Sequence, residues 1–311
     1  MSIVYFDSTM PEPQVRQKLY EGSLFVYSPR PSVQALCDFA RALTEEAFGH
    51  IHPTLAQHHL APSEYAQILN QLKPRFINHP HSKQLIQNIL REMGFDLDKT
   101  YFDVPRMRTA TSHGYLTTGI AYSFDPHRDT WFSAPMNQLN WWIPMYDIEA
   151  DNCLTFYPSY WDQPVRNESD GYDCRDWYAE SRRLQVGGLP DERKRPRPLD
   201  AVDHVHELRL VGQVGGLILF SGAHLHGTVP NTTNATRFSM DFRTVHLDDV
   251  AAHTAAPNVD SHCTGTLLGD FLHPVTLAPV PGELVARYES GTPVQAERTP
   301  SVRPKAGVPA Q

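Results

Sequence analysis

Hydrophobic residues in the first hundred positions recur at the spacing of α-helices. Three stretches show this pattern, at residues 31–49, 64–72 and 82–93. The first has a proline near its start and Gly49 at its end, which are common boundary signals of a helix. A short β-rich run at residues 23–27 precedes it. The sequence therefore predicts a helical layer over residues 1–100.

From about residue 101 the hydrophobic pattern changes to that of short strands. The expected strands are residues 107–112, 117–124, 138–146, 153–157, 205–210, 216–220 and 237–246. Turn residues such as Asp151-Asn152 and Gly212 separate them, and most have no helix-length segment in between. This pattern predicts antiparallel strands in a barrel or sandwich, and it disfavours a parallel doubly wound sheet.

Two further segments complete the organisation. Residues 158–203 are too polar for a core and have the length of an insertion or lid. The chain becomes rich in proline near its end, which is typical of an extended tail. We expect a single domain at residues 1–273, with a β-rich core at about 101–250, followed by a Pro-rich tail at 274–311.

Composition narrows the class of protein. The 311 residues are 41% hydrophobic and 20% charged, as in ordinary soluble globular proteins, and the net charge of −8 disfavours nucleic-acid and anionic-membrane partners. No apolar run approaches the roughly 20 residues of a membrane span. No secretion signal is visible, and the four cysteines show no close pairing. We therefore expect a cytoplasmic protein that acts on a small molecule, with its oligomeric state left open.

Candidate metal ligands occur at His127-Arg128-Asp129. With 16 histidines, roughly one His-x-Asp triplet is expected by chance, and a second one occurs at His246-x-Asp248. Only the first is followed by a strand, a histidine at His226 and a later strand that opens with Arg237. Because side chains alternate along a strand, Arg237 and Ser239 share one face. The context therefore favours the first triplet.

These motifs, together with the segment ADNCLTFYP, resemble those of the Fe(II)/2-oxoglutarate-dependent dioxygenases, in particular the phytanoyl-CoA dioxygenase-like family. The resemblance covers roughly residues 100–245. It implies a mainly β fold, with a double-stranded β-helix (jelly roll, cupin-like) core. It also implies that His127, Asp129 and His226 bind Fe(II), and that Arg237 and Ser239 hold the distal carboxylate of 2-oxoglutarate.

The expected chemistry suits these residue types. Two imidazoles and one carboxylate occupy one face of an octahedral Fe(II) and leave three positions open for 2-oxoglutarate and O₂. The planar guanidinium of Arg237 matches a carboxylate better than a lysine does. Because Asp129 retains the carboxylate, the resemblance implies oxidation, most simply hydroxylation, of a small organic substrate. Decarboxylation of 2-oxoglutarate to succinate accompanies it.

Several alternatives remain open from the sequence. His224 shares the strand parity of His226, and Arg243 is a rival of Arg237 for the clamp. A cupin-type metalloenzyme that does not use 2-oxoglutarate would keep the three metal ligands without needing Arg237. A metal-free binding protein with a barrel fold would need none of these residues.

Residues for substrate binding are predicted from one strand face. Gln138, Asn140 and Trp142 alternate along an expected strand close to the metal motif, which suits a pocket with a few orienting donors. Ordinary filling of a barrel would give the same pattern. The insertion also carries aromatic residues that could close over a substrate, at Trp161, Tyr172, Trp177 and Tyr178. The identity of the substrate cannot be read from the sequence.

Overall fold

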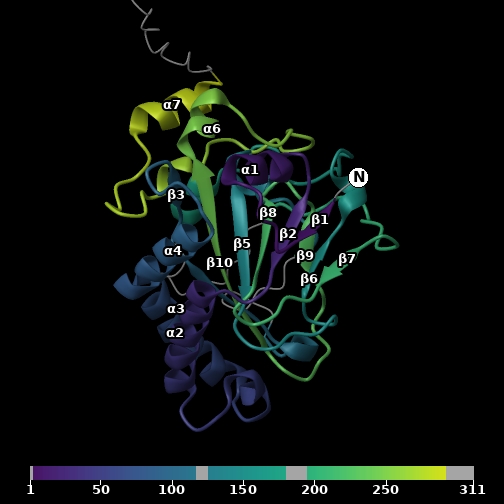
Figure 1. Cartoon of the computed structure of the whole chain (residues 1–311). Helices are drawn as coiled ribbons and strands as arrows, with labels where there is room; N and C mark the ends of the chain where they lie inside the picture. The colour runs from purple at the N-terminus through teal and green to yellow at the C-terminus, as the bar shows by residue number, and fades with distance from the viewer. Residues whose placement is uncertain (1–2, 117–124, 180–194, 292–311) are drawn as a thin grey trace, which may run out of the picture.

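The structure is a computed structural model that describes residues 3–116, 125–179 and 195–291. A seven-stranded sheet forms its centre, in the order β1-β2-β8-β5-β10-β3, with β4 also paired to β10 (Figure 1). Its strands are β1 (Val4–Phe6), β2 (Leu24–Tyr27), β3 (Thr100–Phe102), β4 (Arg106–Ala110), β5 (Leu139–Pro144), β8 (Leu217–Ser221) and β10 (Arg237–His246). Only the β1–β2 pairing is parallel among these strands.

A second sheet of three strands packs against one face of the first. It has the order β7-β6-β9, with β6 at Leu154–Phe156, β7 at Leu208–Leu210 and β9 at His226–Thr228. Apolar side chains of both sheets share one buried cluster, in which the rings of Phe156 and Phe220 lie 4.9 Å apart. Two sheets of mainly antiparallel strands that enclose apolar side chains are the arrangement of a sandwich or closed barrel.

The predicted sheet-rich character is thereby confirmed, and helices contribute a substantial part of the fold. Six of the seven strands expected after residue 101 correspond to β4, β5, β6, β7, β8 and β10, and the strand expected at residues 23–27 corresponds to β2. The expected strand at residues 117–124 lies outside the described residues. The finer assignment, a double-stranded β-helix core, stays a prediction.

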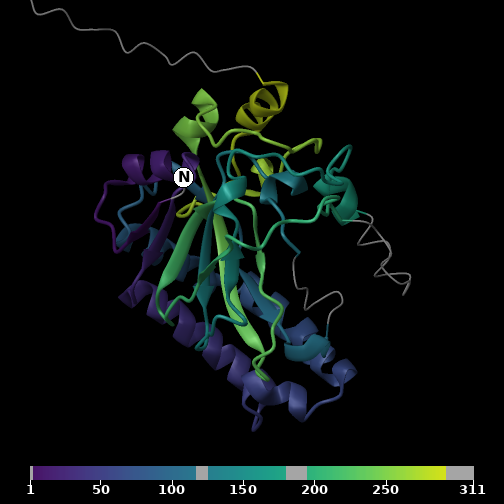
Figure 2. The same cartoon turned by 90° about the vertical axis from the view of Figure 1, so that its right-hand side faces the viewer.

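Helices cover the other face of the large sheet, where they run from purple to blue in Figure 2. They are α1 (Glu12–Tyr20), α2 (Pro31–Phe48), α3 (Pro62–Asn78) and α4 (Pro80–Glu92). The three helices predicted from periodicity correspond to α2, α3 and α4. Their buried apolar side chains join those of β2, β5, β8 and β10 in the largest cluster. The sequence analysis did not predict α1, which is short and has only four buried residues.

The C-terminal part adds α6 (Leu247–Ala252) and α7 (Gly282–Ser290), which pack together beside β3 and β10 (Figure 1). Short 3-10 helices complete the described chain, at Pro53–His58, Ser112–Gly114, Asp129–Phe132, Pro158–Tyr160 and Leu268–Asp270. The division into a domain at residues 1–273 and a tail at 274–311 stays a prediction, as does a lid at residues 158–203. In the described ranges, no helix combines the length and apolar character needed to cross a membrane.

Gly22 joins α1 to β2 in a backbone conformation that favours glycine, with φ at +89°. A Cβ at this position would lie 2.5 Å from the Cδ2 atom of Trp161. We expect Gly22→Ala to lower the free energy of unfolding by about 2–4 kcal/mol, from the left-handed backbone and the overpacking together. Urea unfolding measures this loss. Gly212→Ala, where the nearest contact is 3.8 Å, is the matched control and should change stability by less than about 1 kcal/mol; equal losses in both variants would contradict the prediction.

Candidate metal centre and cosubstrate site

His127 and His226 are neighbours on adjacent backbone segments. His226 begins β9, and its N–H donates to the carbonyl of His127 at 2.9 Å, while the His127 N–H donates to the carbonyl of His226 at 2.8 Å. Residues that exchange both hydrogen bonds in an antiparallel bridge project their side chains to the same face. The two imidazole centroids accordingly lie 4.4 Å apart.

Hydrogen bonds to the backbone select the metal-binding tautomer of both imidazoles. Nδ1 of His127 lies 2.8 Å from the carbonyl oxygen of Asp125, and Nδ1 of His226 lies 2.9 Å from that of His224. An Nδ1–H that donates to a carbonyl leaves Nε2 as an unprotonated ligand atom. Burial lowers the pKa of His226 to about 4, so this ring is neutral near pH 7.

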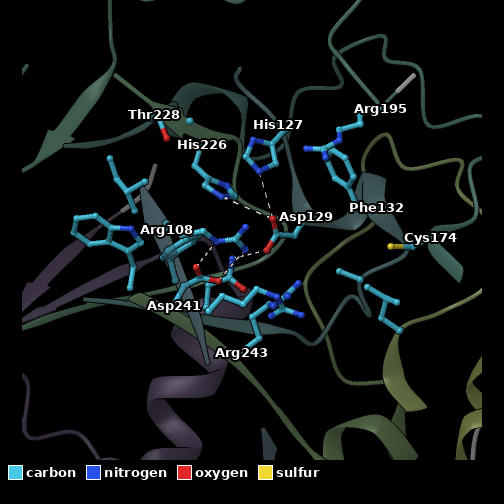
Figure 3. Close-up of a pocket in the computed structure, with 18 of the residues that line it drawn as sticks. Arg108, His127, Asp129, Phe132, Cys174, Arg195, His226, Thr228, Asp241 and Arg243 are labelled. Carbon is cyan, nitrogen blue, oxygen red and sulfur yellow. Dashed lines mark hydrogen bonds and ion pairs between the residues drawn. The ribbon is translucent and has the colours of Figure 1, made fainter. Parts of the chain in front are cut away.

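Asp129 presents one carboxylate oxygen to these two nitrogens (Figure 3). Its Oδ1 lies 3.5 Å from Nε2 of His127 and 3.9 Å from Nε2 of His226. Its Oδ2 accepts hydrogen bonds from Nδ2 of Asn140 at 2.7 Å and from Nε2 of Gln138 at 2.9 Å. These amides fix the carboxylate plane and leave Oδ1 directed toward the imidazoles.

The position of Asp129 follows from its local backbone. The N–H of Asp129 donates to the carbonyl of Gly222 at 2.9 Å, in the turn that follows β8. Asp129 is also the first residue of the 3-10 helix Asp129–Phe132. Burial by itself would raise the pKa of Asp129, but His127, His226 and Arg243 stabilise the carboxylate, and its pKa stays well below the ordinary value.

The three side chains form a donor set that fits a divalent metal. One ligand atom from each of His127, Asp129 and His226 lies within 4.8 Å of the others, and this is the only such group of three found among the described residues. Two lone-pair nitrogens and a carboxylate oxygen face one another, an arrangement that a cation stabilises. A 2-His-1-carboxylate set is typical of non-haem Fe(II) sites.

Arg237 and Ser239 lie on the strand face that borders the same cavity. Arg237 is 5% exposed, and its guanidinium donates to the carbonyl of Asn152 at 2.8 Å and lies over the ring of Trp142 at 5.7 Å. Among the described residues, its Nε and the hydroxyl of Ser239 have no hydrogen-bond partner. Burial lowers the pKa of Arg237 to about 10. A buried cation with unused donors beside a cavity suits a carboxylate ligand.

The cavity connecting these groups has a volume of about 270 Å³, just below the usual range of ligand pockets. The three candidate metal ligands, Arg237, Asn140 and Trp142 all line it. Gln138 and Ser239 do not line it, and the contacts of Gln138 are with Asp129 and Asn140. We therefore assign Gln138 and Asn140 to positioning Asp129. Substrate contact stays a prediction for Gln138, Asn140 and Trp142.

The insertion closes one side of the cavity. Among its described residues, five line the cavity, namely Tyr172, Cys174, Trp177, Tyr178 and Arg195. Trp161, which the sequence placed with these aromatics, packs instead on His224, with ring centroids 4.6 Å apart. The buried Arg128 anchors the insertion, because its guanidinium donates to the carbonyl of Gln163 at 3.0 Å and pairs with Asp260 at 3.0 Å.

His224 lies outside the metal cluster. Its Nε2 lies 2.9 Å from the carbonyl oxygen of Gly22, its side chain is completely buried, and its Nδ1 has no hydrogen-bond partner among the described residues. Of the two histidines that share a strand parity, His226 is therefore the one that faces Asp129. Burial lowers the pKa of His224 to about 3.

This buried imidazole predicts a pH-dependent stability for the metal-free protein. Because its pKa in the folded state lies below the ordinary 6.5, the unfolded chain binds the additional proton between pH 6.5 and pH 3. The contribution of His224 is therefore complete above pH 6.5 and falls as the pH drops toward 3. Between pH 7 and pH 4.5 we expect wild type to lose about 2–3 kcal/mol more than His224→Gln, measured by urea unfolding. Equal losses would refute this assignment.

Sequence reasoning missed the remaining charged residues of the cavity. Arg106, Arg108 and Asp241 line it on the same face as Arg237. They occupy alternate positions in strands whose intervening residues are buried, such as Met107 and Met240. The sequence did contain a signal for these cavity residues, since charged residues recur two positions apart in an otherwise buried strand.

Comparison with known proteins agrees with this geometry. The family model for phytanoyl-CoA dioxygenase (PhyH) matches residues 25–239, more than half of the chain. The fold and the site thus define a non-haem iron- and 2-oxoglutarate-dependent oxygenase with the cofactors Fe(II), 2-oxoglutarate and O₂. The chain belongs to the phytanoyl-CoA dioxygenase family. This membership disfavours both alternatives, the metalloenzyme without 2-oxoglutarate and the metal-free binding protein.

Several solved structures are distantly similar to this chain. EvdO2 from Micromonospora carbonacea var. aurantiaca is 14% identical over 79% of this chain and 94% of its own, with a TM-score of 0.43. Its complex with 2-oxoglutarate is 15% identical with a TM-score of 0.34, and the match spans 56% of this chain and 62% of that one. The carbocyclase SnoK from nogalamycin biosynthesis is 12% identical over 89% of this chain and 95% of its own, with a TM-score of 0.40. No curated protein matches the sequence.

Proposed function

We propose that this oxygenase hydroxylates a small organic substrate, with His127, Asp129 and His226 as the iron ligands and with Arg237 and Ser239 as the clamp for 2-oxoglutarate. The convergence of three ligand atoms within 4.8 Å carries the proposal. The cavity that they border also contains a buried arginine with an unused donor. Bound Fe(II) supplies O₂ activation coupled to decarboxylation of 2-oxoglutarate to succinate and CO₂.

Each side chain has a separate task in this proposal. The backbone carbonyls of Asp125 and His224 keep both imidazoles in the tautomer that leaves Nε2 unprotonated. Gln138 and Asn140 hold Oδ2 of Asp129 and thereby direct Oδ1 toward the ligand position. Arg237 orients the cosubstrate through its planar donors. The aromatic residues of the insertion exclude water from the cavity.

Hydroxylation is the simplest outcome for this donor set. Asp129 keeps the carboxylate, so the protein supplies three ligands to an octahedral ion and leaves no additional position for a halide once 2-oxoglutarate and O₂ have bound.

The four cysteines are free thiols, which supports a cytoplasmic location for the enzyme.

Succinate formation under ¹⁸O₂ tests the proposal. Anaerobically prepared Fe(II)-loaded protein is mixed with 2-oxoglutarate and ¹⁸O₂, and succinate is quantified by mass spectrometry with iron-free protein as the control. We expect iron-dependent succinate that contains one ¹⁸O atom, and hydroxylated product that contains the other once a substrate is supplied. Absence of succinate, together with undetectable binding of 2-oxoglutarate to the iron-loaded protein, would contradict the proposal.

A further inference from the structure

A buried ion pair is attached to the segment that carries two of the metal ligands. Arg128 stands between His127 and Asp129 in the chain and is 2% exposed, and its partner Asp260 is 4% exposed. The Arg128 Nε lies 3.0 Å from Oδ2 of Asp260. A buried ion pair adds little net stability, because the cost of removing both charges from water offsets their attraction. The presence of this pair therefore calls for a reason other than stability.

Arg128 connects the two segments that carry the ligands, residues 127–129 and the segment after β8 that leads to His226. Its Nη1 donates to the carbonyl of Ala223 at 2.6 Å. The adjacent carbonyl of Gly222 accepts a backbone N–H of the first segment at 2.9 Å. Further along, His226 forms the β-bridge to the first segment. The separation of the two ligand segments therefore depends on a bond from the Arg128 side chain as well as on backbone bonds.

The same guanidinium also binds the insertion. Its Nη2 donates to the carbonyl of Tyr160 at 2.5 Å and to that of Gln163 at 3.0 Å. With the bonds to Asp260 and Ala223, four of the five N–H donors of Arg128 have partners, and these partners lie on three segments of the chain. A lysine could not replace this arginine, because its donors all leave from one nitrogen atom.

Asp260 binds the ligand segment and the insertion as well. Its Oδ1 accepts the Nε1–H of Trp131 at 2.7 Å, and its Oδ2 accepts the backbone N–H of Val165 at 3.0 Å in addition to Arg128. Trp131 is fully buried and belongs to the 3-10 helix that begins at Asp129. An asparagine at position 260 would direct an N–H group toward at least one of these three donors.

A second link lies at the other end of this 3-10 helix. Ser133 follows the helix, and its hydroxyl accepts the backbone N–H of Cys174 at 3.1 Å and donates to the carbonyl of Thr264 at 2.9 Å. Cys174 lines the cavity together with Tyr172. The described start of the insertion is therefore attached to both ends of the helix that carries a metal ligand.

We infer that the Arg128–Asp260 pair positions the metal ligands, by holding the two ligand segments at the separation that the metal requires and by fixing the insertion to them. This inference rests on the proposed function, in which the three side chains bind the metal. The pair acts through the backbone of residues 127–129 and 222–223. Its effect on binding follows because ligands must stay within about 0.5 Å of the productive geometry.

Metal binding by Asp260→Asn tests the inference. Co(II) is titrated into the metal-free protein, because the visible ligand-field spectrum of this ion reports its coordination geometry. We expect a loss of Co(II) affinity of about 10–100-fold, as for the removal of other groups that orient ligands, together with a changed spectrum. Leu90→Ala is the control, since it opens a cavity in the helical layer and lowers stability there. It should keep the wild-type affinity and spectrum.

Arg128→Lys separates charge from geometry. It keeps a positive charge opposite Asp260, which limits the loss of stability, but it cannot hold the carbonyls of Ala223 and Tyr160 at the same time. We expect its Co(II) affinity to fall about tenfold or more. This variant decides the test if Asp260→Asn does not fold. Wild-type affinity and spectrum in the folded variants of the pair, or an equal change in Leu90→Ala, would overturn the inference.

His127→Ala distinguishes a failure of this inference from a failure of the proposed function. A Co(II) site that persists in His127→Ala would refute the ligand assignment and this inference with it. A site that His127→Ala abolishes, but that Asp260→Asn and Arg128→Lys leave unchanged, would refute the positioning role alone. We expect His127→Ala to lose the site and the two variants of the pair to alter it.

Discussion

Replacement of Asp129 by alanine is expected to abolish stoichiometric iron binding and to reduce succinate formation to below about 1% of wild type. The carboxylate is the single charged ligand of the three, and its Oδ1 lies between the two imidazole Nε2 atoms. Removal of a partner behind a ligand already costs about 10–100-fold in metal affinity, so removal of the ligand itself should cost more. Iron content after anaerobic desalting and succinate yield measure the two effects.

The second His-x-Asp triplet provides the matched control for this substitution. Asp248 lies in α6, is solvent-exposed and pairs with Lys99. Asp248→Ala should therefore retain wild-type iron stoichiometry and succinate yield. The iron affinity of Asn140→Ala should lie between those of Asp129→Ala and Asp248→Ala. We expect about a 10–100-fold loss, because this substitution removes one hydrogen bond to Oδ2 of Asp129. Full iron binding by Asp129→Ala would refute the assignment of the ligands.

The Arg237→Ala variant is expected to raise the KM for 2-oxoglutarate by about 30–3000-fold while iron binding is retained. The loss of one partner from a buried charge pair costs about 2–5 kcal/mol, and each 1.4 kcal/mol corresponds to a factor of ten. The residue is buried, with its guanidinium over the Trp142 ring and hydrogen-bonded to the carbonyl of Asn152, so water replaces its contact poorly. Initial rates of succinate formation over a range of 2-oxoglutarate concentrations give this value.

Charge and shape can be separated at this position. Arg237→Lys keeps the charge but loses the planar pair of donors, and it should recover only part of the affinity. Ser239→Ala, which removes one neutral donor, should raise the KM by about tenfold or less. Arg209→Ala is the control, since this arginine is exposed and pairs with Glu207. An unchanged KM in Arg237→Ala would show that 2-oxoglutarate binds elsewhere, and Arg243 would then be tested in the same way.

The metal site was largely predictable because its information is local. The spacing of His127 and Asp129, and the strand that leads to His226, are properties of short segments. Local sequence did not decide between His226 and His224 as the ligand. Both occupy positions of the same parity along the strand, and only the β-bridge from His226 to His127 and the contact of His224 with Gly22 distinguish them.

The roles of the polar residues on β5 were less predictable. Gln138 and Asn140 were expected to contact substrate because they share a face near the metal motif. Their contact with Asp129 depends on how β5 lies beside the turn at Gly222, whose carbonyl accepts the Asp129 N–H. No pattern within either segment specifies that arrangement.

The sequence by itself determined the positions of α2, α3 and α4, those of six strands after residue 101 (β4, β5, β6, β7, β8 and β10), and the three ligand candidates, since periodicity and motif spacing are encoded within short windows. The tertiary structure alone decided which charged side chains meet. Arg108 and Asp241 pair because β4 and β10 lie side by side in one register, and that register is set by the apolar residues on the opposite face of the sheet. The charge balance of the cavity is therefore a consequence of packing between segments that are more than 100 residues apart in the chain.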